Sequence, residues 1–178
     1  MDQISSRQCP QVYEDLGIDT NKLGCIMVDT EPIEVSSVID PADLYHDPED
    51  EFAQGVISEA MPHVTLLYGL LSSGQAMRKH VDTVLNGWEL GSVQITSVTA
   101  FEGNPDYTPL VAEVSTDGLD EAHARLQLLP HIDTFPEYRP HITLAYLKPG
   151  ADVVGYVDTL NRRLALMQVP VTGLNYGA

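Results

Sequence analysis

One short pattern occurs twice in this chain. Residues 62–68 read Pro-His-Val-Thr-Leu-Leu-Tyr, and residues 140–146 read Pro-His-Ile-Thr-Leu-Ala-Tyr. At average residue frequencies, the central His-x-Thr-Leu arises by chance on the order of once in several thousand positions. Two copies, each extended on both sides by matching residues, therefore indicate two equivalent structural segments rather than a bias of composition.

The repeated segments have the alternation of half-buried strands. Val, Ile, Thr and Tyr favour strands, and successive side chains along a strand point to opposite faces. His63 and Thr65 are therefore predicted to share one face of the first segment, and His141 and Thr143 one face of the second. The same alternation assigns the apolar residues of each segment to the opposite face.

Strands and helices are mixed along the rest of the chain. Apolar runs predict strands at residues 23–29, 62–69, 93–101, 110–115, 138–147 and 169–176. Apolar residues at helical spacing predict helices at residues 51–61, 77–88, 119–129 and 153–164. This mixture indicates the α+β class. Because no linker divides the pattern, we predict an N-terminal arm over residues 1–22 and a single domain over residues 23–178.

The charge balance restricts the ligands. The chain carries 26 acidic residues against nine Lys and Arg, a formal net charge of −17. Proteins that hold long nucleic acids neutralise phosphates with basic side chains, and no basic run is present here. Long DNA or RNA is therefore not expected as the main ligand. A small anionic ligand in one local pocket remains compatible with this charge, which also favours solubility.

The sequence also argues against membrane and metal-scaffold classes. No apolar run approaches the ~20 residues that cross a bilayer, and residues 1–11 lack the layout of a secretion signal. The only cysteines are Cys9 and Cys25, with no Cys-x-x-Cys motif. We therefore expect a soluble, cytoplasmic protein without membrane contact, disulfide, structural zinc or cofactor. The pattern predicts no particular oligomeric state.

Two histidines with two threonines suit phosphodiester cleavage. One histidine takes a proton from the attacking oxygen and the other protonates the leaving oxygen, since imidazole titrates near neutral pH. The threonine hydroxyls are able to donate hydrogen bonds to the non-bridging phosphate oxygens, where charge grows in the transition state. We predict His63 and His141 as catalytic residues, Thr65 and Thr143 as phosphate-binding residues, and no metal. Either histidine is able to serve as the base.

With these motifs, the chain resembles the two-histidine (2H), LigT-like phosphoesterase superfamily, whose signature is two His-x-Thr/Ser motifs on strands. The resemblance implies a bilobal α+β fold in which two mainly antiparallel sheets form a central cleft with helices packed outside. It also implies the acid/base role for the two histidines and phosphate binding for the two threonines. The wording of residues 63–69, His-Val-Thr-Leu-Leu-Tyr-Gly, is similar to the phage branch, which includes anti-CBASS cyclic-oligonucleotide phosphodiesterases.

Three functions follow from this resemblance. The first is a metal-independent phosphodiesterase that cleaves small, cyclic oligonucleotides, as a phage counter-defence enzyme acting in the host cytoplasm. The second keeps the chemistry but acts on RNA 2′,3′-cyclic or 2′-5′ phosphodiesters. The third is a nucleotide-binding sponge that sequesters its ligand without cleaving it. Complete, paired motifs argue against the sponge, because binding alone needs no proton-transfer pair.

Several other residues receive weaker hypotheses. Strand alternation predicts that Tyr68 and Tyr146 face away from the histidines, in the core. Arg139 shares the face of His141 and is either an ordinary exposed arginine or a phosphate contact. Tyr107, in a turn-rich loop, is a candidate for stacking a base. The remaining four histidines lack a partnered motif and are predicted to be surface residues; they are His46, His80, His123 and His131.

Overall fold

Six strands form the framework of the molecule. The computed structural model describes residues 22–49, 55–133, 135 and 137–177. The strands are β1 (Gly24–Thr30), β2 (His63–Leu70), β3 (Ser92–Ala100), β4 (Thr108–Val114), β5 (His141–Leu147) and β6 (Gln168–Asn175). They pair antiparallel in the order β1-β2-β5-β4-β3-β6 and close into a ring. The predicted α+β class is confirmed.

The ring has two weak junctions. We expected two separate sheets around a cleft, whereas the described strands form one closed, six-stranded sheet. Between β2 and β5 the pairing consists of Val64 opposite Ile142. Between β3 and β6 it covers residues 92–94 and 168–170, after which β6 turns to pair with β1. The sheet therefore has two well-paired halves, β6-β1-β2 and β5-β4-β3, and the two repeated segments meet at one junction.

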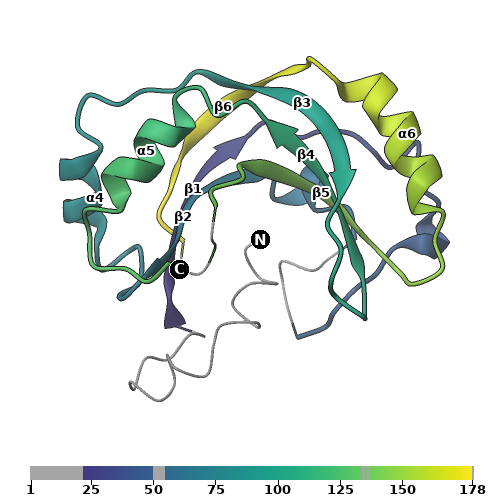
Figure 1. The fold of residues 1–178 in the computed structure, drawn as a ribbon, viewed down its shortest axis with the longest axis horizontal. Helices are drawn as coiled ribbons and strands as arrows, with labels where there is room; N and C mark the ends of the chain where they lie inside the picture. The colour runs from purple at the N-terminus through teal and green to yellow at the C-terminus, as the bar shows by residue number, and fades with distance from the viewer. Residues whose placement is uncertain (1–21, 50–54, 134, 136, 178) are drawn as a thin grey trace.

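Helices cover the outside of both halves. The described helices are α3 (Ile57–Ala60), α4 (Arg78–Val84), α5 (Leu119–Leu126) and α6 (Val153–Leu164), with one 3-10 turn at Pro41–Asp43. Helix α5 packs on β2 and beside α4, whereas α6 packs on β3 and β4. Figure 1 shows α4 and α5 on one side of the strands and α6 on the opposite side. Each half of the sheet thus has its own helical support.

The predicted strands agree with the structure to within a few residues, and α6 has the predicted bounds, whereas α4 and α5 are shorter than predicted. Helix α6 begins after Asp152, whose side chain accepts a hydrogen bond from the Gly155 N–H, and buries Leu160 and Leu164. Of the helix predicted at residues 51–61, the structure describes only the part that contains α3, because residues 51–54 lie outside the described residues. Residues 1–21 of the predicted arm also lie outside them.

Both repeated strands contain a bulge at the same residue of the repeat. In β2, Thr65 lies opposite Met27 and Leu67 opposite Ile26, so Leu66 is an extra residue. In β5, Thr143 lies opposite Val111 and Ala145 opposite Leu110, so Leu144 is the extra one. A bulge reverses the alternation beyond it and bends the strand. The strands consequently diverge after the junction at Val64 and Ile142, and residues beyond each bulge change face.

The bulges correct the prediction for the two tyrosines. Tyr68 lies opposite Cys25, two residues from Met27, and thus on the same face as His63. Tyr146 follows the second bulge in the same way and is buried, as predicted, but in a separate cluster with Tyr107 and Ile57 rather than in the main core. Period-2 alternation predicted the opposite face, because it assumes a strand without an extra residue.

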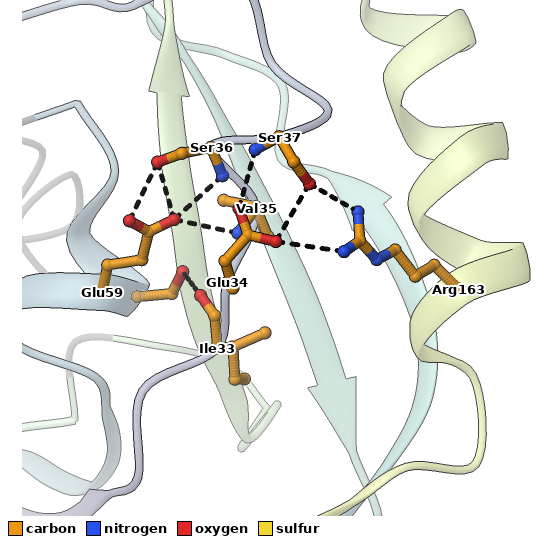
Figure 2. A network of polar contacts seen from close by, with 8 residues as sticks. Ile33, Glu34, Val35, Ser36, Ser37, Glu59 and Arg163 are labelled. Atoms are coloured by element: carbon orange, nitrogen blue, oxygen red, sulfur yellow. Dashed lines mark hydrogen bonds and ion pairs between the residues drawn. The ribbon is translucent and has the colours of Figure 1, made fainter.

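The segment after β1 is fastened to α3 by polar contacts (Figure 2). The Glu59 carboxylate accepts hydrogen bonds from the N–H groups of Val35 and Ser36, each at 2.9 Å, and from the Ser36 hydroxyl. The buried Ser58 hydroxyl donates to the Ile33 carbonyl at 2.8 Å. These contacts hold α3 in place only a few residues before β2 begins, and therefore help to position the start of β2.

Candidate active site

The two predicted histidines begin the two repeated strands at the junction of the sheet. His63 is the first residue of β2 and His141 the first residue of β5. The residues that follow them, Val64 and Ile142, are Cα partners and are fully buried in the core. Residues next to a facing pair point to the opposite side of the sheet. Both imidazoles therefore project from the same face, away from the main core.

Extending this register by one residue in each direction gives two rows across the junction. His63 then faces Thr143, and Thr65 faces His141. Facing residues of antiparallel strands have Cβ atoms about 5 Å apart, and diagonal neighbours about 7–8 Å. His63 and His141 are diagonal neighbours, close enough for the charge of His141 to act on His63. The structure thus brings together all four predicted site residues.

Each imidazole is oriented by a backbone carbonyl two residues upstream. His63 Nδ1 donates to the Met61 carbonyl and His141 Nδ1 to the Arg139 carbonyl, both at 2.8 Å. A carbonyl only accepts, so Nδ1 carries the proton and Nε2 is the basic nitrogen of each neutral ring. The two rings therefore share one tautomer and one orientation relative to their strands.

The prolines that precede the two histidines are held in equivalent ways. The Thr30 N–H donates to the Pro62 carbonyl at 3.1 Å, and the Val114 N–H donates to the Pro140 carbonyl at 3.2 Å. Each bond ties the residue before a histidine to the neighbouring strand, β1 or β4. The two halves of the site are therefore built in the same way.

The surroundings of the histidines favour their neutral forms. Burial lowers the pKa of His141 to about 3. Burial also lowers the pKa of His63, and the positive charge of a protonated His141 lowers it further. One carboxylate acts in the opposite direction on each ring, Asp29 on His63 and Glu113 on His141. A positive charge on one imidazole therefore disfavours a positive charge on the other.

Asp29 and Glu113 were missed by the sequence analysis. Asp29 is the Cα partner of His63, and Glu113 is the Cα partner of His141. Both residues lie in predicted strands, but the strand pattern alone does not reveal which residues pair across strands. The sequence shows only that each residue lies in a strand, and this does not reveal which residue of another strand lies opposite.

Arg139 is engaged by protein groups. Its guanidinium contacts Glu113 Oε1 at 2.6 and 2.8 Å and lies over the ring of Phe101, 4.8 Å from its centroid. Phe101 in turn meets the His141 ring edge-on, with centroids 4.8 Å apart. A direct phosphate contact would therefore require Arg139 to break its ion pair with Glu113. In the structure, Arg139 instead packs on Phe101, which contacts the His141 ring.

Two further aromatic hypotheses are corrected. Tyr107 is 1% exposed and packs between Tyr45 and Tyr146, so it is not available to stack a base. His123 is not a simple surface residue: its Nδ1 donates to the Leu66 carbonyl at 2.7 Å, and its ring stacks on Tyr138 at 4.0 Å. His123 therefore links α5 to the bulge of β2.

Cys25 lies beside the site without being suited to nucleophilic attack. Its Sγ lies 4.0 Å from Thr65 Oγ1, in hydrogen-bonding geometry. Burial raises the pKa of the thiol to about 11, so it remains protonated at neutral pH.

Within the described part of the chain, no group of three or more His, Cys, Asp and Glu side chains is arranged to hold a metal ion. In the same residues, no helix has the length and apolar character needed to span a membrane.

Two strands that each carry a His-x-Thr motif thus meet on one face of an antiparallel sheet. The family model of the 2′-5′ RNA ligase superfamily matches residues 32–175, about four fifths of the chain. The chain belongs to this superfamily, that of the LigT-like 2H phosphoesterases, which are enzymes acting on nucleotides. No individual curated protein gives a significant match.

Proposed function

We propose that this chain is a metal-independent phosphodiesterase that cleaves small, cyclic oligonucleotides. His63 and His141 are the general acid and base, and Thr65 and Thr143 bind the phosphate. The observation that supports this proposal is the diagonal placement of the two imidazoles on one face, each opposite the threonine of the other strand. Cleavage requires a base on one side of the phosphorus and an acid on the other, whereas ligand storage requires neither.

The reaction uses only groups of the chain and substrate. One imidazole removes the proton of the hydroxyl next to the phosphodiester, and that oxygen forms a new bond to phosphorus. The bond from phosphorus to the leaving oxygen breaks, and the second imidazole gives this oxygen a proton. A cyclic phosphate remains, which water opens in a second step with the two roles exchanged. The threonine hydroxyls stabilise the additional charge on the non-bridging oxygens.

The charge of the protein favours a small substrate. A net charge of −17 opposes the approach of a long polyanion, whereas a cyclic dinucleotide or trinucleotide carries few charges and contacts one face only. We extend the proposal to the removal of cyclic-oligonucleotide defence signals by a phage enzyme, on the wording of residues 63–69. We also propose that residues 23–178 act as a single catalytic domain.

A second candidate is a phosphodiesterase for 2′-5′-linked or 2′,3′-cyclic RNA. The superfamily is described by its activity on 2′-5′ RNA linkages, which favours this substrate independently of the charge argument. A 2′-5′ linkage has a neighbouring 3′ hydroxyl that attacks in the same way, whereas a 2′,3′-cyclic phosphate enters at the second step, in which water opens the ring. The two candidates use the same four side chains and differ in the substrate.

A substrate panel tests both candidates. The protein is incubated with cyclic dinucleotides and trinucleotides, 2′-5′ dinucleotides and RNA ending in a 2′,3′-cyclic phosphate, and products are identified by mass spectrometry. The double variant His63→Ala, His141→Ala is the matched control, and circular dichroism verifies its fold. We expect cleavage of cyclic substrates by the wild type alone. Activity on RNA ends only would favour the second candidate, and tight binding without cleavage would favour the sponge.

A further inference from the structure

The two histidines face carboxylates that have different partners. Asp29 and Glu113 occupy equivalent positions, since each is the Cα partner of one histidine on the outer neighbouring strand. Each acts to raise the pKa of its histidine. The residues that follow them, Thr30 and Val114, bind the equivalent proline carbonyls. Because the two positions are otherwise equivalent, different partners of the two carboxylates give the two histidines different electrostatic surroundings.

Glu113 is neutralised by a cation. Its Oε1 accepts the hydrogen bonds of the Arg139 guanidinium, while the Ser97 hydroxyl donates to Oε2 at 3.4 Å. Arg139 also acts directly on His141 and lowers the pKa of that ring. The carboxylate and the guanidinium therefore largely cancel at His141, and the remaining influence is burial, which favours the neutral imidazole.

Asp29 is held by a neutral amide. Asn175 Nδ2 donates to Asp29 Oδ1 at 3.0 Å, and Asn175 Oδ1 accepts from the Gly177 N–H at 2.8 Å. The second bond fixes the orientation of the amide, because only its NH₂ side is then directed at Asp29. An amide orients the carboxylate without removing its negative charge. Asp29 therefore presents a full charge to His63.

We infer that Asp29, oriented by Asn175, is a positioning residue that stabilises protonated His63 and makes His63 the acid, and His141 the base, of the first step. This inference rests on the proposed function and deepens it. In that step His141 Nε2 takes the proton of the attacking hydroxyl, the new oxygen–phosphorus bond forms, and the leaving oxygen departs with a proton from His63. In the second step, the roles are exchanged.

The charged groups on the strands beside His63 bear on this assignment. The groups that act on His63 from neighbouring strands are Asp29 on β1 and His141 on β5. When His141 is neutral, its opposing charge vanishes, whereas the charge of Asp29 continues to act on His63. The state with neutral His141 and protonated His63 is therefore the preferred single-proton state of the pair. That state is the one needed to start the reaction.

The test is a histidine titration combined with a rate profile. Proton NMR follows the ring signals of the full chain against pH, with His63→Gln used to assign the His63 signal. In Asp29→Asn we expect the His63 titration to move to lower pH, with little movement of the His141 titration. Asn175→Ala should move the His63 titration in the same direction by less. Asp158→Asn, which removes a carboxylate on the exposed side of α6, should change neither titration.

The rate profile separates an electrostatic role from a structural one. If His63 is the acid, Asp29→Asn moves the alkaline limb of kcat/KM to lower pH by about half a pH unit or more and leaves the acid limb in place. A shift of the acid limb alone would overturn the assignment, as would an unchanged His63 titration in both Asp29→Asn and Asn175→Ala. The titration needs no substrate. Its failure is therefore distinguishable from failure of the proposed function, which would appear as a wild type that cleaves nothing.

Discussion

Glu59 is expected to matter for catalysis although it lies outside the site. Its carboxylate holds the segment after β1, and its helix, α3, ends directly before Met61. The Met61 carbonyl orients the His63 ring, and the Met61 N–H donates to the Ile57 carbonyl at 2.8 Å. Replacing Glu59 with Ala therefore loosens the support of one catalytic histidine without touching the site itself.

The contacts of Glu59 set the expected magnitude. The carboxylate accepts hydrogen bonds from two backbone N–H groups and one hydroxyl. Hydrogen bonds to charged groups contribute about 1.5–3 kcal/mol when well shielded, and this site is only half-buried. We expect Glu59→Ala to lower the free energy of unfolding by about 2 kcal/mol, which corresponds to about 4–8 °C in Tm for a chain of this size. A 1 Å misplacement of a catalytic group costs about 10²-fold in rate. Because Glu59 supports His63 only indirectly, we expect a smaller fall in kcat, of about tenfold.

The stability effect should depend on pH. Burial acts to raise the pKa of Glu59, but hydrogen bonds from Ser36 and Val35 outweigh burial, so the pKa in the folded protein is lowered. The stabilisation is therefore complete above the unfolded value of about 4.3 and is lost as pH falls through the lower folded value. The difference in Tm between wild type and Glu59→Ala should accordingly be constant near neutral pH and close in acid.

Thermal melts and steady-state kinetics measure these effects, and Glu34→Ala is the matched control. Glu34 lies in the same loop but binds Ser37 and Arg163, and not α3 (Figure 2). As an exposed ion pair it contributes about 1 kcal/mol or less. We expect Glu34→Ala to retain full kcat. Equal loss of Tm in both variants together with an unchanged kcat in Glu59→Ala would refute the reasoning.

Four other outcomes are expected. Thr65→Val or Thr143→Val should lower kcat by about 10²-fold while circular dichroism remains unchanged, and wild-type rates would contradict their role in phosphate binding. Cleavage should persist in excess EDTA. A loss of activity that a divalent ion restores would contradict the metal-independent mechanism. The rate–pH profile should be bell-shaped with its optimum below pH 6.5, the ordinary histidine pKa, because both histidine pKa values are lowered. The rate falls in acid as the base is protonated and in alkali as the acid loses its proton. An optimum above pH 7 would disagree. Leu166→Gly should raise Tm by about 2–4 °C, since Leu166 adopts a left-handed φ of 68° that costs a leucine about 1 kcal/mol more than a glycine, and an unchanged Tm would show that this strain is absent.

The kinds and approximate places of the elements were predictable because their causes are local. Alternation predicted the strands of the repeat, and the spacing of Val153, Val157, Leu160 and Leu164 predicted α6. The family resemblance also came from short sequence motifs. The arrangement of the strands into one closed ring was not predictable, since it depends on a junction of a single residue pair.

The sequence by itself determined that two strands each present a histidine and a threonine on one face, because side-chain direction along a strand follows from the backbone. Only the tertiary structure decided what lies beside them. The bulges at Leu66 and Leu144 turned the tyrosines to the histidine face, and strand register placed Asp29 opposite His63. Asn175 binds Asp29 across a separation of 146 residues. Such partners depend on how strands pair, which is a property of the packed sheet and not of any one segment.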